Sequence, residues 1–203
     1  MSLPVPPPAA LPSAGLDLLF REAHTAYAFN SEPVSDEQLL AIYELTRLGP
    51  TAMNSQPLRV AYVRSLDAKA RLLPHLAEGN RAKSESAAAV AILAADTDFH
   101  LHLERVAPHQ RGARERYEAD TQGRVQAALF NATLQAGYFI MAVRAMGLDA
   151  GPMGGFDRQG IDEEFFAGTS LRSILVVNLG YVAEGGHRPR SPRLEPEEAV
   201  SIW

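Results

Sequence analysis

The stretch Gly49-Pro50-Thr51-Ala52-Met53-Asn54-Ser55-Gln56-Pro57 joins two segments of different periodicity. Residues 36–48 before it are amphipathic at helical spacing, and residues 58–63 after it form an apolar run typical of a strand. The two prolines stiffen the loop, because each fixes its own φ and restricts the preceding residue. Polar side chains held in a fixed pattern suit a flat, polar heterocycle, whereas the alternative is an ordinary helix-to-strand turn. The candidate side chains are those of Thr51, Asn54 and Gln56.

Helical and apolar segments alternate along the rest of the chain, which predicts an α+β or α/β layered domain. Helices are expected at 16–28, 36–48, 65–76, 125–146 and 162–167, and strands at 60–63, 87–95 and 173–179. The run 87–95 is apolar throughout, which favours a strand buried on both faces and leaves a helix open. The 125–146 helix is apolar nearly all round and is expected in the core or in a subunit interface. Residues 99–123 are polar and irregular, as in a lid or a peripheral helical excursion.

Length and composition narrow the class of protein. The chain has 203 residues, enough for one domain, here expected at 16–203 after an extended or disordered Pro- and Ala-rich arm at 1–15. With a net charge of −5 and no basic stripe, nucleic-acid binding is not expected. Cysteine is absent, which excludes disulfides and thiol chemistry and fits a cytoplasmic protein. Polar residues interrupt the longest apolar segment, 125–147, so no membrane span is expected.

Several histidines could in principle bind a metal ion. His100 and His102 are two positions apart, and His75 and His109 lie elsewhere in the chain. No acidic residue at a typical ligand spacing accompanies them, and their segment favours helix or loop rather than a strand. We therefore predict no metal site.

Four motifs occur in a characteristic order: Leu48-Gly-Pro-Thr51, Gly151-Pro-Met-x-Gly-Phe-Asp157, Glu163 to Gly168 (EEFFAG) and Arg190-Ser-Pro-Arg-Leu194. From about Leu19 to the C-terminus the sequence resembles the nitroreductase family of FMN-dependent oxidoreductases. It is most similar to the branch that includes malonic semialdehyde reductase. The resemblance implies a central mixed sheet flanked by helices, in an intertwined homodimer. FMN would lie at the subunit interface between residues of both subunits, with the 125–146 helix as the dimer core.

The resemblance also implies which residues surround the FMN phosphate. Arg193 matches the C-terminal basic position, and Arg190 and Arg188 lie close enough to help, since arginine pairs bidentately with phosphate. His24, followed by Thr25, stands where relatives tend to have arginine, and Arg21 one turn earlier is a possible replacement for that charge. The alternatives are a solvated basic tail and a half-exposed helical histidine.

Two further groups are assigned to the flavin ring by the resemblance. Thr51, Asn54 and Gln56 would reach the ribityl chain or ring edge, and Asn80 and Lys83 share one helical face. A lysine beside the ring edge stabilises negative charge on reduced flavin. Near N5, the glycines let the backbone approach the ring, and many relatives have Glu at the first of them. The catalytic candidates are Gly154 and Gly155, with Pro152 and Met153 beside them as cofactor-binding residues; the alternative is a tight turn.

The expected activity is hydride transfer from NADH or NADPH through flavin N5 to a small acceptor in a ping-pong reaction. Nitro compounds, quinones or a small aldehyde acid such as malonic semialdehyde are the acceptors that the resemblance implies. Two alternatives stay open: a non-catalytic flavin carrier on the same fold, and a dimeric scaffold without a cofactor.

Overall fold

The computed structural model describes residues 10–203, so the expected arm lies mostly outside the described residues. Residues 13–15, assigned to that arm from the sequence, instead begin a short helix. The N-terminal half contains α1 (Ser13–Leu16), the π-helix η1 (Asp17–Arg21), α2 (Asp36–Thr46), the 3-10 turn η2 (Ala52–Asn54), β1 (Leu58–Val63), α3 (Leu66–Leu72), η3 (Leu73–His75), α4 (Glu78–Ser86) and β2 (Ala89–Asp96). The C-terminal half contains η4 (Phe99–His102), α5 (Leu103–Val106), α6 (Ala113–Ala119), α7 (Thr121–Ala145), β3 (Asp149–Met153), α8 (Arg158–Phe165), β4 (Leu171–Gly180) and α9 (Pro196–Ala199).

The central sheet has the strand order β1-β2-β4-β3, and every neighbouring pair in it is antiparallel. The expectation of a mixed sheet is therefore wrong for the described chain. β3 was missed in the sequence because it contains Gly151 and Pro152, which are turn residues in most contexts. Pro152 is tolerated because β3 pairs only with β4 and so forms an edge of the sheet.

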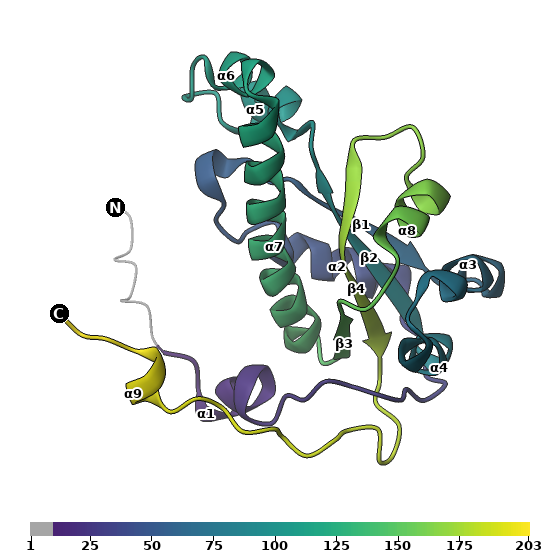
Figure 1. Ribbon diagram of the computed structural model, residues 1–203. Helices are drawn as coiled ribbons and strands as arrows, with labels where there is room; N and C mark the ends of the chain where they lie inside the picture. Colours follow the sequence, from purple (N-terminus) through teal and green to yellow (C-terminus); the bar gives the residue numbers. More distant parts are fainter. Residues whose placement is uncertain (1–9) are drawn as a thin grey trace, which may run out of the picture.

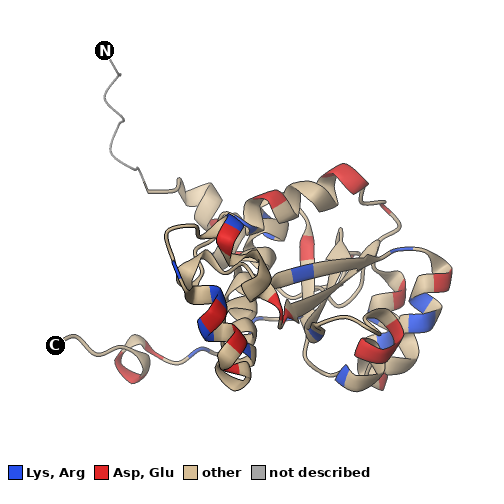
Figure 2. Ribbon diagram, turned by 90° about the horizontal axis from the view of Figure 1, so that it is seen from above, with Lys and Arg blue, Asp and Glu red and all other residues tan. Residues whose placement is uncertain are grey.

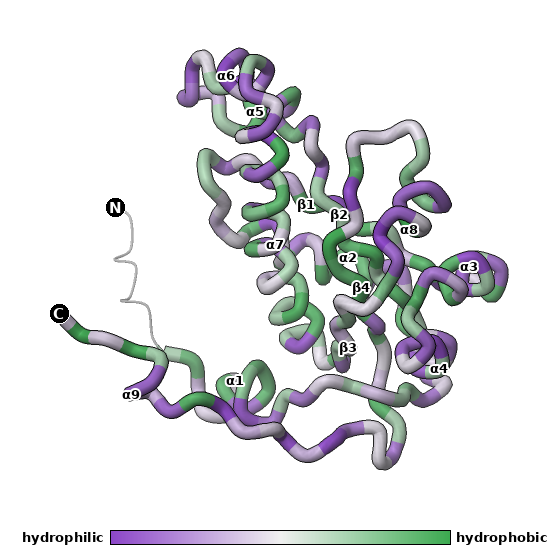
Figure 3. The backbone as a smooth tube through the Cα atoms, viewed as in Figure 1, coloured by the Kyte–Doolittle hydropathy of each residue, from purple (hydrophilic) through white to green (hydrophobic). Residues whose placement is uncertain are grey.

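Helices cover both faces of this sheet (Figure 1). One hydrophobic cluster packs α2 and α7 against one face, and a second cluster packs α3, η3 and α8 against the other. All eight residues of β2 are buried, which confirms the prediction of a strand covered on both faces. Figure 3 shows hydrophobic residues at the centre, around β4 and α2, and hydrophilic ones on α6 and α8 at the periphery. The predicted α+β layered architecture is thus confirmed.

The predicted helix at 16–28 ends early, because tertiary pairing competes with it. The π-helix stops at Arg21, and the chain then runs extended beside residues 182–187 (Figure 1). The amide of Ala26 donates to the carbonyl of Ala150 over 3.2 Å, and that of Tyr27 to Gly186 over 2.8 Å. This pairing places residues 23–27 next to the C-terminal segment.

The long helix α7 begins close to its predicted start, with the Asp120 side chain accepting from the Gly123 amide as a cap. The polar segment before it forms η4, α5 and α6 at the N-terminal end of α7 (Figure 1), in agreement with a helical excursion. Charged residues of both signs are spread over the helices (Figure 2).

Candidate functional site

A cation-rich cleft of about 430 Å³ lies where the N-terminal segment, the last turn of α7 and the C-terminal segment meet. Its lining residues are Phe20, Ala23, His24, Thr25, Tyr27, Arg144, Arg188, Pro189, Arg190, Ser191 and Arg193. Four guanidinium groups and one imidazole therefore line the cleft, and within the described residues no carboxylate does. Such a set of donors suits an anion with several oxygens, such as a phosphate. His24, Thr25, Arg190 and Arg193, all predicted from the sequence, are brought together here.

The arginines of this cleft differ in what already binds them. Arg193 Nη1 donates only to the carbonyls of its neighbours Ser191 and Pro192. The Arg188 guanidinium lies over the Tyr27 ring, 4.0 Å from its centroid, in a cation–π contact. Arg190 instead donates to three backbone carbonyls of the N-terminal segment. Arg193 and Arg188 thus keep most of their donors for a ligand.

His24 lies between the cleft and a second histidine. Its Nδ1 is 3.1 Å from the Arg188 carbonyl oxygen, so that nitrogen carries the proton if this contact is a hydrogen bond. Its ring stacks on His187 at a centroid distance of 5.4 Å, and His187 Nε2 lies 3.1 Å from Asp149 Oδ1. Arg21 is bound to Asp17 over 2.8 Å and does not line the cleft.

Sequence reasoning missed Arg144 as a site residue. It lies in the last turn of α7, and its Nη1 donates to the Leu19 carbonyl over 2.9 Å. Burial lowers the pKa of Arg144, and the nearby charge of Arg190 lowers it further. The available signal is an arginine near the end of an otherwise apolar helix, one of the polar residues that interrupt the 125–147 segment.

Asn80 and Lys83 lie on α4 and face the cleft region from another side. Asn80 Nδ2 donates to the Gly155 carbonyl over 2.8 Å. The Lys83 ammonium lies over the same Tyr27 ring as Arg188, 5.1 Å from its centroid. Burial lowers the pKa of Lys83, and repulsion from Arg188 adds to the effect. The predicted pair is therefore placed between the glycine segment and the arginines.

The segment after β3 has an opening at Gly154. A Cβ added there would meet no atom within 4 Å, whereas one at Gly155 would lie 3.2 Å from Asn80 Nδ2. Pro152 pairs with Val177 in the sheet, so the turn alternative is wrong for this part of the segment. The Met153 side chain is buried, with its sulfur 3.8 Å from Ser84 Oγ. It can therefore contribute to a ligand site only through its backbone.

The loop of residues 51–56 lies elsewhere along α7. Met53, Asn54 and Gln56 all have positive φ, between 44° and 56°, a strained conformation for non-glycine residues. The Ala52 amide donates to Asn131 Oδ1, which lies roughly 20 Å along the helix axis from Arg144. One chain alone therefore does not bring this loop to the cation-rich cleft.

Polar groups of the 51–56 loop bond largely to nearby backbone and to one another. Asn54 Nδ2 donates to the Val106 carbonyl over 2.6 Å, and Gln56 Nε2 donates to Asn54 Oδ1 over 2.9 Å. Thr51 Oγ1 accepts from the Gln56 amide over 3.2 Å. The predicted fixed presentation of these three side chains thus has a structural basis.

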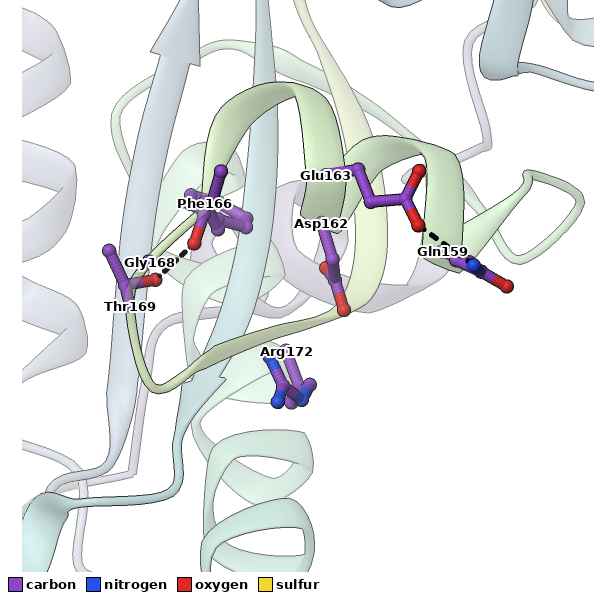
Figure 4. A pocket seen from close by; sticks show the side chains of 8 residues that line it. Gln159, Asp162, Glu163, Phe166, Gly168, Thr169 and Arg172 are labelled. Carbon is purple, nitrogen blue, oxygen red and sulfur yellow. Dashed lines mark hydrogen bonds between the residues drawn. The ribbon is translucent and has the colours of Figure 1, made fainter.

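A larger hollow of about 650 Å³ lies beside α8 (Figure 4). Its polar groups are held locally: Gln159 Nε2 donates to Glu163 Oε1 over 2.7 Å, and Thr169 Oγ1 donates to the Phe166 carbonyl over 2.6 Å. Asp162 Oδ1 accepts from the amide of Ser173. Asp162, the residue directly before the EEFFAG motif, thus fastens α8 to β4.

The histidines considered as metal ligands are separated in the structure. His100 is buried, with its Nε2 2.8 Å from Glu118 Oε2, while His102 Nε2 lies 4.0 Å from Asp96 Oδ2. Within residues 10–203, no group of three His, Asp or Glu side chains is placed to hold a metal ion. In the same part of the chain, no helix is both long and apolar enough to cross a bilayer.

The protein is an α+β protein in which the long helix α7 packs across an antiparallel sheet. A guanidinium-rich cleft lies at the C-terminal end of α7, and its donors suit a phosphorylated ligand. The chain belongs to the nitroreductase family, whose sequence model matches residues 20–181.

Similar proteins agree with this assignment. A Streptomyces coelicolor protein named "Putative NADH dehydrogenase/NAD(P)H nitroreductase SCO7141" is 52% identical and covers 98% of each chain. A Leptothrix cholodnii protein with the same description is 50% identical over 95% of this chain and 98% of its own. Among solved structures, an Exiguobacterium sibiricum protein determined in complex with FMN has a TM-score of 0.81 at 21% identity, covering 93% of this chain and 96% of that one.

Proposed function

We propose that this protein is an FMN-dependent oxidoreductase that takes hydride from NAD(P)H and passes it to a small acceptor. The observation that carries the proposal is the cleft lined by four arginines and His24. Tyr27 of its lining contacts Lys83 of α4, and Asn80 of the same helix binds Gly155. The names of the close relatives support an NAD(P)H-linked activity, and the FMN complex of the Exiguobacterium protein supports the cofactor.

The residues of the cleft divide into two roles. Arg193, Arg188 and His24 would hold the phosphate through charge-assisted hydrogen bonds, with the Thr25 hydroxyl as a further donor. Arg144 and Arg190 add positive charge at the rim. FMN, when bound, supplies the hydride chemistry at N5.

Helix α4 and the glycine segment bound to it would contact the flavin ring. Lys83 holds a positive charge in the region expected for the ring edge, where it opposes negative charge. Asn80 fixes the Gly155 carbonyl, and among the described residues the Gly155 amide donates to no protein atom. That amide is free to donate to a ligand, and the open space at Gly154 leaves room for a flat ring. These features fit the catalytic assignment of Gly154 and Gly155.

A second copy of the chain would complete the site. Thr51, Asn54 and Gln56 are too far along α7 to reach the cleft of their own chain, so we assign them to the partner's cofactor. Exposed apolar side chains on and after α2 and on α7 support a homodimer: Leu40 is 65% exposed, Leu48 75% and Phe130 71%. A monomer in light scattering would contradict this assembly.

The proposed acceptor is a nitro compound, a quinone or a small aldehyde acid such as malonic semialdehyde. It would be reduced in a ping-pong reaction. The electron donor is either NADH or NADPH. A non-catalytic flavin carrier is the second candidate, favoured by His24 in place of arginine and by the absence of a side chain at Gly154.

The deciding experiment is the absorbance spectrum of the purified protein before and after anaerobic addition of NADH and NADPH. A yellow protein bleached by either nucleotide supports the oxidoreductase. A yellow protein that neither nucleotide bleaches supports the carrier. A colourless protein that does not bind added FMN would refute both.

A further inference from the structure

The C-terminal end of η1 is held by two guanidinium groups. Arg190 Nη2 donates to the carbonyls of Phe20, Arg21 and Ala23 over 3.2, 2.6 and 2.9 Å. Arg144 Nη1 donates to the carbonyl of Leu19 over 2.9 Å. The last carbonyls of a helix have no partner within it and carry partial negative charge, so cations bind there favourably. Three carbonyls of η1, those of Leu19, Phe20 and Arg21, are satisfied here by side chains from distant parts of the sequence, and the Ala23 carbonyl just beyond the helix is bound in the same way.

The hydrogen bonds from Arg190 to the carbonyls of residues 20–23 are called the Arg190 clamp below. The residues directly after it are His24 and Thr25, which line the cleft. On their other side, the amides of Ala26 and Tyr27 are bonded to Ala150 and Gly186. His24 and Thr25 are thus held between two fixed points, the Arg190 clamp and this backbone pairing. Loss of the clamp would free the N-terminal side of this backbone pairing, which should then open more often.

We propose that Arg190 is a positioning residue, whose guanidinium fastens the end of η1 to the C-terminal segment and so places His24 and Thr25 in the cofactor cleft. This role deepens the proposed FMN site and rests on it. Arg190 differs in this role from Arg193, whose Nη1 donates only to the carbonyls of the two preceding residues and so fixes no distant segment. The contact between Arg190 and residues 20–23 spans about 170 positions of sequence.

The first test uses hydrogen exchange on the apoprotein of Arg190→Met, with Arg193→Met as the matched control. We expect the amides of Ala26 and Tyr27 to exchange about tenfold faster or more in Arg190→Met and at the wild-type rate in Arg193→Met. Unchanged exchange in a folded Arg190→Met protein would overturn the clamp. If that variant does not fold, Arg190→Lys keeps the charge on a shorter group, and the same two amides are expected to exchange faster.

The second test is a double-mutant cycle on FMN affinity with His24→Gln and Arg190→Met. Each single change is expected to weaken binding about tenfold. If Arg190 acts through His24, the double variant should bind FMN little worse than Arg190→Met alone. The reason is that a histidine already displaced from the cleft no longer contributes to FMN affinity. Multiplying effects would mean that Arg190 is an independent phosphate ligand and would overturn the proposal. Failure of the wild type to bind FMN would refute the proposed function, while the exchange result on apoprotein would still decide the clamp.

Discussion

The side-chain amide of Asn80 donates to the carbonyl oxygen of Gly155 over 2.8 Å and joins α4 to the segment after β3. Both residues are exposed or half-buried, and they are 75 positions apart in the sequence. The bond ties the segment that presents the Gly155 amide to the helix that carries Lys83. It therefore connects two parts of the proposed ring site that the sequence separates.

Replacing Asn80 with alanine removes this bond and leaves the Ala77 amide, 3.1 Å away, as the remaining donor to the Gly155 carbonyl. Because a neutral hydrogen bond contributes about 1 kcal/mol, we expect FMN affinity to fall roughly fivefold in a flavin fluorescence titration. Asn30→Ala is the control, since Asn30 Oδ1 accepts only from the nearby Glu32 amide. Equal affinity of the Asn80 variant and the wild type would show that this bond does not support the site.

Alanine at Gly154 should leave stability nearly unchanged, whereas alanine at Gly151 should lower it. A Cβ at Gly154 meets nothing within 4 Å, so the free energy of unfolding should change by less than about 0.5 kcal/mol. A Cβ at Gly151 would lie 2.8 Å from the Ala26 carbonyl oxygen, and backbone must move to admit it. We expect a loss of about 1–3 kcal/mol in urea denaturation of the apoprotein. Similar values for the two variants would disprove the close approach at Gly151.

Removing Arg193 tests the phosphate assignment directly. Arg193→Ala should weaken FMN binding by about 2 kcal/mol, or roughly thirtyfold, because a charge-assisted hydrogen bond to the ligand is lost. Arg172→Ala is the matched control, since its exposed side chain donates only to the Leu171 carbonyl. A decrease of similar size in both variants would indicate a general effect of net charge.

Asn131 holds the strained 51–56 loop against α7. Its Oδ1 accepts from the Ala52 amide over 2.7 Å, and its side chain is buried. Asn131→Ala should lower the free energy of unfolding by about 1–3 kcal/mol, since buried hydrogen bonds are lost without replacement. Thr133→Ala on the same helix, whose exposed hydroxyl donates to the Leu129 carbonyl, should cost less than about 0.5 kcal/mol. Equal costs would show that the loop does not depend on Asn131.

Lys83 should reduce the stability of the apoprotein at neutral pH. Burial and Arg188 lower its pKa, so below that pKa the folded protein carries a charge that is better solvated when the chain unfolds. Between the lowered pKa and the ordinary value of about 10.4, the unfolded chain binds more protons, and stability rises with pH. Lys83→Met should therefore stabilise the apoprotein at pH 7, and its advantage should shrink as the pH rises through that interval.

The measurement for Lys83 is the urea midpoint of both proteins from pH 7 to pH 10.5. The same variant should bind FMN more weakly, because the positive charge near the ring edge is gone. A variant that is less stable than the wild type at neutral pH would contradict the assigned cause of the pKa shift.

Much of the fold follows from local pattern. The buried strand β2 was predicted from a continuous apolar run, helix α2 from its amphipathic spacing, and the long helix α7 from an extended apolar segment. β3 was not, because Gly151 and Pro152 carry turn propensity and the strand exists only through its pairing with β4. The helix expected across residues 22–28 failed for the same reason, since its backbone pairs with distant segments instead.

By itself, the sequence determined the alternation of elements, the family and the residue types that can hold a phosphorylated cofactor. Tertiary structure decided which of those residues meet: Asn80 with Gly155, and Arg188 with Lys83 at Tyr27. It also decided that Arg190 binds backbone carbonyls of the N-terminal segment and that residues 51–56 lie away from the cleft. Periodicity reports on neighbours within a few residues, whereas these contacts join positions about 50 to 170 apart and depend on how the whole chain packs.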